Sequence, residues 1–279
     1  MEALRTGGGI GMGVDYDQVK ASTREMWSLG DYTPLAQSLE PAARELVDAC
    51  RVSSGEDVLD VAAGNGNCAI AAAQKGARVV ASDLTPAMVT LGRQRTAAAG
   101  FDIEWAEADA EDLPFEENRF DAVTSVFGAM IAPRPDLVAS EMFRVVKPGG
   151  VVGMANWTPA SFMRKLSDVS SKYLPPRPEE LPDAFAWGME ETVRSRFEGL
   201  ASSIQLDRRL LTWEHDSWED WRATSESFGG TVLAKRMLPP DVYNRMAQEM
   251  EGLFREHNEA TEGRVVIASE YLLVVAKKA

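Results

Sequence analysis

Residues 57–73, DVLDVAAGNGNCAIAAA, join an apolar run, a short glycine-containing loop and an alanine-rich helical pattern. This order of strand, loop and helix is typical of a βαβ unit, in which backbone N–H groups at the helix N-terminus bind a ligand. The spacing Gly64-x-Gly66-x-x-Ala69 fits the fingerprint of dinucleotide-binding folds. A carboxylate, Asp60, lies within the strand, four residues before the first glycine. The stretch therefore predicts an α/β fold with a ligand at the loop.

Short apolar runs and helical patterns alternate after this unit, as they do in doubly wound parallel sheets. The expected strands are 57–62, 78–83, 102–107, 120–126, 149–156, about 203–214 and the C-terminal run VVIASEYLLVVAKK. The expected helices are 67–75, 86–99, 135–145, 159–173 and 189–199. Two further helical patterns, SWEDWRATSESF and PPDVYNRMAQEMEGLFREHNEA, lie between the last two strands.

Composition limits the partners that the chain can have. The 279 residues are 45% apolar, which is enough for a substantial core, and carry a net charge of -14. This charge disfavours nucleic acid and anionic membranes as partners. The sequence has neither a membrane-spanning run nor a secretory signal pattern, so we expect a cytoplasmic protein. Cys50 and Cys68 are interpreted as core residues, and no His or Cys spacing indicates a metal site.

Three acidic residues fall at the carboxyl ends of the first three strands, where doubly wound sheets bind their ligands. Asp60 lies near the end of the first strand, Asp83 ends the second, and Asp109 follows the third. Asp83 could hydrogen-bond the ribose of either NAD or a simple adenosine. Asp60 discriminates between them, because it would repel a pyrophosphate and attract a sulfonium or an ammonium group. We therefore expect a ligand that is adenosine-like at one end and cationic at the other.

S-adenosylmethionine has this charge pattern, and the sequence closely resembles the class I S-adenosylmethionine-dependent methyltransferases. The similarity is to the small-molecule branch related to the ubiquinone and menaquinone methyltransferases. Four stretches carry it over about residues 55–157, namely VLDVAAGNGN, VVASDLTPAMV, EADAEDLPFEENRFDAV and RVVKPGG. Four such motifs in register are far more specific than a single glycine loop.

The resemblance implies S-adenosylmethionine as the cofactor and assigns its contacts. Asp60 would face the ammonium group, Asp83 the ribose hydroxyls, and Asp109 with the Ala110 N–H the edge of the adenine. The remaining implied cofactor contacts are Ala62, Gly64, Gly66, Leu84, Met88, Val126, Phe127 and Tyr32. For Leu84 and Met88 ordinary helix packing is an equally good interpretation.

The resemblance also implies the strand order 3-2-1-4-5-7-6 with the last strand antiparallel. In that topology the sixth strand ends, and the seventh begins, at the cofactor edge, so the long segment between them is expected to form a helical cap over the site. The expected organisation is a flexible tail (1–14), an N-terminal helical lid (15–54), a Rossmann-like core (55–215 and 263–279) and the cap (216–262).

Aromatic residues gather after the strand ends and in the cap, which favours an apolar or aromatic methyl acceptor. The expected acceptor contacts are Trp27, Phe127, Asn156, Trp157, Trp218, Trp221 and Phe228. His215, at the end of the sixth strand, is the candidate for a general base, although an exposed turn histidine is the more common interpretation of such a position.

The sequence thus predicts a small-molecule methyltransferase of natural-product metabolism, with a small-molecule acceptor as its partner and homo-oligomerisation left open. Two alternatives remain at this point. One is a nicotinamide-dependent oxidoreductase, against which Asp60 argues, and the other is an adenosylmethionine-binding protein that transfers no methyl group.

Overall fold

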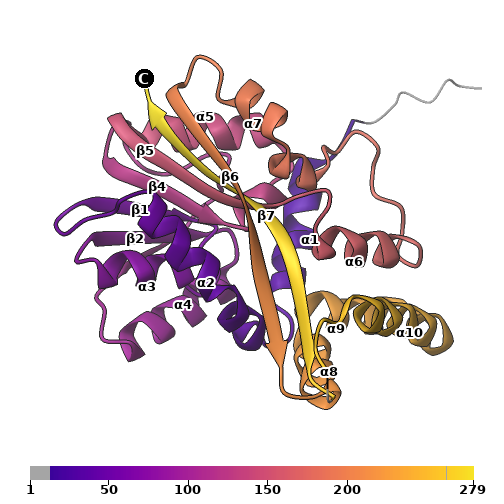
Figure 1. Ribbon diagram of the computed structural model, residues 1–279. Helices are drawn as coiled ribbons and strands as arrows, with labels where there is room; N and C mark the ends of the chain where they lie inside the picture. The colour runs from indigo at the N-terminus through magenta and orange to yellow at the C-terminus, as the bar shows by residue number, and fades with distance from the viewer. Residues whose placement is uncertain (1–12, 262) are drawn as a thin grey trace, which may run out of the picture.

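A seven-stranded sheet forms the centre of the protein in the computed structural model, which describes residues 13–261 and 263–279 (Figure 1). The strands are β1 (Asp57–Val61), β2 (Arg78–Asp83), β3 (Glu104–Glu107), β4 (Phe120–Val126), β5 (Val146–Trp157), β6 (Ala201–His215) and β7 (Val265–Lys278). The expected flexible tail, residues 1–14, lies outside the described residues except for Gly13 and Val14.

The strands lie in the order β3-β2-β1-β4-β5-β7-β6. The pairs among β1 to β5 are parallel, whereas β7 runs antiparallel to both β5 and β6. The predicted fold class and strand order are therefore confirmed. The order reverses between β1 and β4, so the carboxyl ends of these two strands form the switch point at which such sheets bind ligands.

Helices cover both faces of the sheet and close its carboxyl edge. They are α1 (Tyr16–Trp27), α2 (Thr33–Ala49), α3 (Asn67–Gln74), α4 (Pro86–Ala98), α5 (Pro135–Val145), α6 (Phe162–Ser171), α7 (Glu190–Arg196), α8 (Trp218–Ser227), α9 (Gly229–Met237) and α10 (Pro240–His257), with short 3₁₀ turns at Ala129–Ile131 and Ala184–Gly188. Right-handed crossovers place α3 and α4 on one face and α5 on the other. Helix α2 lies beside α3, where its Cys50 end packs against Gly153 of β5 (Figure 1).

In the described part of the long connection between β6 and β7, the chain forms three helices. Figure 1 shows α8, α9 and α10 grouped beyond the far ends of these two strands. The Ser217 hydroxyl starts α8 by accepting a hydrogen bond from the Asp220 N–H at 3.1 Å. Helix α9 is an element that the sequence analysis did not predict.

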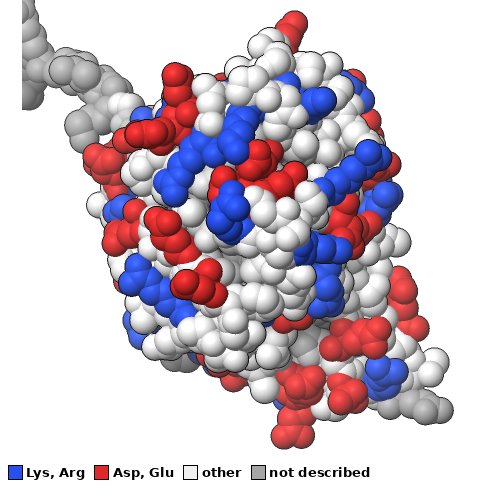
Figure 2. Space-filling model, turned by 90° about the vertical axis from the view of Figure 1, so that its left-hand side faces the viewer, with Lys and Arg blue, Asp and Glu red and all other residues white. Residues whose placement is uncertain are grey.

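The surface carries both signs of charge. On the face drawn in Figure 2, Lys and Arg side chains lie among Asp and Glu side chains. Arg78 and Asp57, for example, pair at 2.7 Å between Nε and Oδ1. Among the helices in the described parts of the chain, none has the length and apolar character needed to span a bilayer.

Candidate active site

The loop after β1 is built on backbone that most side chains avoid. Ala62, Gly64 and Gly66 have φ angles of 53°, 57° and 90°. A Cβ atom on Gly64 would lie 3.0 Å from a ring carbon of Tyr32, so this position needs both the left-handed conformation and the small size of glycine. The N–H groups at the start of α3 are thereby turned toward the switch point, and the sequence fingerprint has its expected structural context.

Asp60 lies in the penultimate position of β1 with its side chain buried. Its Oδ2 accepts a hydrogen bond from the Ala69 N–H of α3 at 2.9 Å, while Oδ1 has no hydrogen-bond partner within residues 13–261 and 263–279. Burial, reinforced by the nearby charge of Asp83, raises the pKa of Asp60 to about 8. A buried carboxylate oxygen without a partner fits a cationic group of a ligand, such as an amino-acid ammonium.

Asp83 ends β2 and also holds the loop. Its Oδ2 accepts from the Gly64 N–H at 2.9 Å, and its Oδ1 accepts from the Thr85 N–H at 2.8 Å. Each carboxylate oxygen can accept a second hydrogen bond, so the two oxygens of Asp83 can still accept hydrogen bonds from two ribose hydroxyls. Burial raises the pKa of Asp83, and the two backbone N–H groups oppose this shift.

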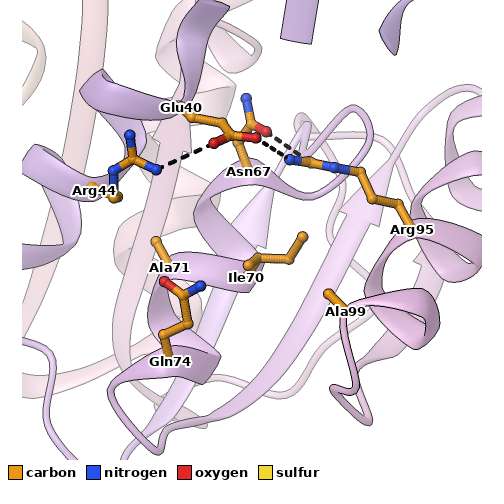
Figure 3. Close-up of a pocket in the computed structure, with 8 residues that line it drawn as sticks. All are labelled: Glu40, Arg44, Asn67, Ile70, Ala71, Gln74, Arg95 and Ala99. Carbon is orange, nitrogen blue, oxygen red and sulfur yellow. Dashed lines mark hydrogen bonds and ion pairs between the residues drawn. The ribbon is translucent and has the colours of Figure 1, made fainter. Parts of the chain in front are cut away.

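A cluster of polar side chains from α2, α3 and α4 holds the loop from behind. It lies beside a small cavity of about 230 Å³, which is separate from the large cavity described below (Figure 3). The Arg95 guanidinium donates to the Asn65 carbonyl oxygen, the Asn65 amide oxygen and the Asn67 amide oxygen at 3.2, 3.0 and 2.6 Å. Its other nitrogen meets Glu40 at 2.7 Å, and Glu40 also pairs with Arg44. The cluster fixes the loop from the side away from the switch point.

A buried lysine that the sequence analysis did not single out lies at the ends of β2 and β3. Lys20 of α1 places its Nζ 2.5 Å from Asp109 Oδ2 and 2.5 Å from Glu111 Oε2. Burial lowers the pKa of Lys20, but the two carboxylates outweigh this and leave it raised. Leu84, Met88 and Ala110 line the same end of the site.

These groups open into one large cavity of about 610 Å³, a size typical of small-molecule sites. It runs from the aspartates to the helices between β6 and β7. Its floor is the Phe127 ring stacked on the Trp157 ring, with centroids 3.8 Å apart. The Trp213 ring meets Trp157 edge-on at 5.8 Å, and Trp221 and Phe228 line the cavity from the α8–α9 region.

Most of the expected site residues line this cavity. They are Trp27, Tyr32, Asp60, Ala62, Gly64, Asp83, Leu84, Met88, Asp109, Ala110, Val126, Phe127, Trp157, His215, Trp221 and Phe228. Three expected residues do not. Gly66 starts α3 against Trp105. Asn156 alternates with Trp157 along β5 and so points to the other side of the sheet. Trp218 is partly buried and packs between Trp221 and the Arg255 guanidinium.

His215 is the last residue of β6 and lines the cavity. Its Nδ1 lies 3.1 Å from Asp220 Oδ2. It follows Trp213 on the same face of β6, and Trp213 in turn contacts Trp157. Ring contacts thus run from Phe127 through Trp157 to Trp213, and His215 is the next residue on that face of β6. In the described part of the chain, no group of three His, Cys, Asp or Glu side chains could hold a metal ion.

Comparison with known proteins identifies the family. Residues 58–150 match the model of a methyltransferase domain. A demethylmenaquinone methyltransferase of Paenarthrobacter aurescens is 32% identical over 210 residues, which are 71% of this chain and 76% of that protein. The chain is a class I S-adenosylmethionine-dependent methyltransferase. Its cofactor is S-adenosylmethionine, and the oxidoreductase and non-methylating alternatives are set aside.

Two further matches extend along almost the whole methyltransferase chain. An uncharacterized protein of Mycobacterium tuberculosis is 39% identical over 269 residues, which are 94% of this chain and 96% of that protein. The crystal structure of a candidate methyltransferase from Bacillus halodurans is 25% identical with a TM-score of 0.55, and the match covers 85% of this chain and 98% of that one. The orphaned Asp60 oxygen and the Gly64 loop fit the methionine part of the cofactor.

Proposed function

We propose that this methyltransferase acts on a small, largely apolar or aromatic acceptor that binds between the Phe127–Trp157 floor and the α8–α10 cap, as one step of natural-product metabolism. The observation that carries the proposal is the continuity of the cavity. The same 610 Å³ space that reaches Asp60 and Asp83 extends to the aromatic cap, so a cofactor and an acceptor can lie in it end to end.

The cofactor would be bound by complementary charge at each end. Asp60 would pair with the ammonium group through its free oxygen, and Asp83 would receive the ribose hydroxyls. Leu84 and Met88 would contact the adenine, with Asp109 and Ala110 at its edge. This arrangement directs the sulfonium toward Phe127, because the amino-acid end is fixed at β1 and the adenosine end at β2 and β3.

Positioning would supply most of the catalysis. When bound, the cofactor supplies an activated methyl group on a sulfonium, and transfer is an in-line displacement. The floor and the cap would hold the acceptor atom in line with that methyl group, and proximity of this kind can account for a large part of the barrier. Closure by α8 and α9 would also exclude water, which is a competing nucleophile.

His215 remains the proposed general base for acceptors that must lose a proton. Its contact with Asp220 would orient the ring. This role requires the reacting group of the acceptor to lie within hydrogen-bond reach of His215 while it is in line with the methyl group.

The test is product formation across a panel of acceptors. The enzyme is incubated with S-adenosylmethionine and either flat hydroxylated aromatics, small amines or short peptides, and release of S-adenosylhomocysteine is measured. The proposal expects turnover only with the aromatic set. Turnover confined to the amines or peptides would contradict the assignment of the aromatic cavity to the acceptor.

A further inference from the structure

Lys20 is a buried lysine in a helix whose other charged side chains face solvent. It is 6% exposed and lines the cavity at the ends of β2 and β3. An unpaired buried ammonium would be very costly, and here it meets two carboxylates from a loop 89 residues further along the chain. This pairing attaches α1 to the cofactor end of the sheet.

The two carboxylates around Lys20 differ in their surroundings. Glu111 is fully buried and is also held by Arg134, whose backbone N–H and Nε each donate to it at 2.7 Å. Asp109 has a 25% exposed side chain and lines the cavity. Asp109 Oδ1 accepts the Glu111 N–H at 2.9 Å, so Lys20 is the second support that fixes the orientation of this carboxylate.

Helix α1 spans the position expected for the adenosine. Lys20 reaches Asp109 after β3, and one turn later the Arg24 Nε donates to the Leu84 carbonyl oxygen after β2 at 3.1 Å. Asp109 and Leu84 are the groups proposed to contact the adenine from its edge and its face. A ligand held between them cannot leave in the direction of α1 unless these contacts break.

We propose that Lys20 is a positioning residue for the cofactor. It fixes the Asp109 carboxylate toward the adenine, and its contacts with Asp109 and Glu111 form a latch that holds α1 across the adenosine end of the site. The inference rests on the proposed placement of the adenosine between Asp83 and Asp109. Its consequence is kinetic. Breaking the Lys20 contacts lets α1 move, so the latch sets how fast the adenosine-bearing ligand dissociates.

The experiment compares Lys20→Met with Lys20→Arg and with Glu25→Gln. Glu25 is an exposed charge on the same helix and is the matched control. Binding of S-adenosylhomocysteine and of 5′-methylthioadenosine is followed by calorimetry and stopped-flow fluorescence. Lys20→Met should raise the dissociation rate constant of both ligands by about 10- to 100-fold, the range expected for a hydrogen bond between charged groups. Lys20→Arg should recover most of the loss, and Glu25→Gln should match the wild type.

A double-mutant cycle separates the latch from a general loss of structure. In an Asp109→Asn background, Lys20→Met should add much less than it does alone. The Michaelis constant for the cofactor should rise while that for the acceptor stays the same. If Lys20→Met does not fold, Lys20→Gln replaces it, with the same expected rise in the dissociation rate constant.

Two negative results are distinguishable. Wild-type protein that binds S-adenosylhomocysteine, together with a Lys20→Met variant indistinguishable from Glu25→Gln, overturns the latch alone. The second result is a wild-type protein that binds S-adenosylhomocysteine tightly but does not bind 5′-methylthioadenosine. It would show that the protein does not hold the ligand by its adenosine, and it would overturn the proposed cofactor placement as well.

Discussion

Two residues with side chains adopt left-handed backbone at the switch point, on either side of the sheet reversal. Ala62 follows β1 with φ 53°, and Phe127 follows β4 with φ 58°. Such residues typically cost about 1–3 kcal/mol each and persist only where the surroundings impose them. Here both line the cavity, and the Ala62 carbonyl oxygen approaches Gly128 so closely that a Cβ there would lie 2.3 Å away. The strain is located where the cofactor is proposed to bind.

Replacing Asp83 tests the proposed ribose contact. Asp83→Ala should weaken binding of S-adenosylhomocysteine by about 1.5–3 kcal/mol, the range for hydrogen bonds to a charged group. Because Asp83 also holds the Gly64 and Thr85 N–H groups, Asp83→Asn is the companion variant that keeps one acceptor oxygen. Calorimetry gives both affinities. Unchanged binding in a folded Ala variant would show that the ribose lies elsewhere.

Asp60 should make cofactor binding release a proton. Its pKa of about 8 means that the free protein carries it mostly protonated at pH 7. An ammonium group binds the ionised form, so affinity should rise with pH up to about 8, and binding at pH 7 should release most of one proton. Calorimetry in two buffers of different ionisation enthalpy measures this. Asp60→Asn should bind more weakly and release none; equal proton release by the two proteins would contradict the assignment.

The same group affects the stability of the free protein. The pKa of Asp60 is about 8 in the folded protein and about 3.9 in the unfolded chain. The folded state therefore keeps its proton over this range while the unfolded state loses it, so the stability that Asp60 contributes below pH 4 is lost as pH rises through 8. The free energy of unfolding of the wild type, relative to Asp60→Asn, should therefore fall between pH 4 and pH 8. Urea titrations at several pH values without cofactor would reveal the trend, and a rise over that range would contradict it.

At the residue scale, the sequence predicted groups whose position follows from the chain itself. Asp60 and Asp83 lie at the ends of strands and Asp109 follows one, and the carboxyl ends of parallel strands meet at one edge. Lys20 could not be predicted in this way. In the sequence it is an ordinary helix lysine, and only the fold brings it to Asp109 and Glu111.

At the element scale, the strands and the helices between them were predictable because each has a clear period and a bounding turn. Helix α9 was not, since it begins with Gly229 and Gly230, which normally indicate a loop. The reason lies in α1. A Cβ on Gly229 would come within 2.3 Å of the Met26 carbonyl oxygen, so this helix start needs glycine to pack against α1.

Two helical glycines should respond in opposite ways to the same change. In α4, a Cβ on Gly92 would lie 2.1 Å from the Trp105 ring, so Gly92→Ala should destabilise the fold by about 1–3 kcal/mol through overpacking. In α10, Gly252 has open space, so Gly252→Ala should stabilise it by about 0.5–1 kcal/mol. Urea unfolding of both variants measures the difference, and the same sign for both would contradict the packing.

At the scale of the whole molecule, the cavity is assembled from segments that are far apart in the sequence. The turn after α1 meets the end of α8, where the Asp31 N–H donates to the Ser227 carbonyl oxygen at 2.9 Å. The Trp27 ring contacts Phe228 at 5.6 Å. The N-terminal helices and the helices between β6 and β7 thus contact each other beside the cavity. Sequence periodicity could predict helices between the last two strands but not which of their side chains face the cavity. For this reason Trp218 and Trp221 were both predicted as acceptor contacts.

Truncation of the cap tests the acceptor assignment. Trp221→Ala and Phe228→Ala should impair acceptor turnover or raise its Michaelis constant more than they weaken S-adenosylhomocysteine binding. Trp218→Ala is the control, because it packs outside the cavity. Loss of a buried aromatic can cost about 3–5 kcal/mol of stability, so unfolding is measured in the same variants. If folded Trp221→Ala and Phe228→Ala proteins methylate the native acceptor like Trp218→Ala, the acceptor binds elsewhere.

A crystal structure with S-adenosylhomocysteine tests the central claim most directly. We expect the amino group on Asp60, the ribose on Asp83, the adenine beneath α1 beside Asp109, and the sulfur facing Phe127 and the aromatic cap. A sulfur atom directed away from the cavity, or an adenine at Asp60 with the amino group at Asp109, would contradict the account.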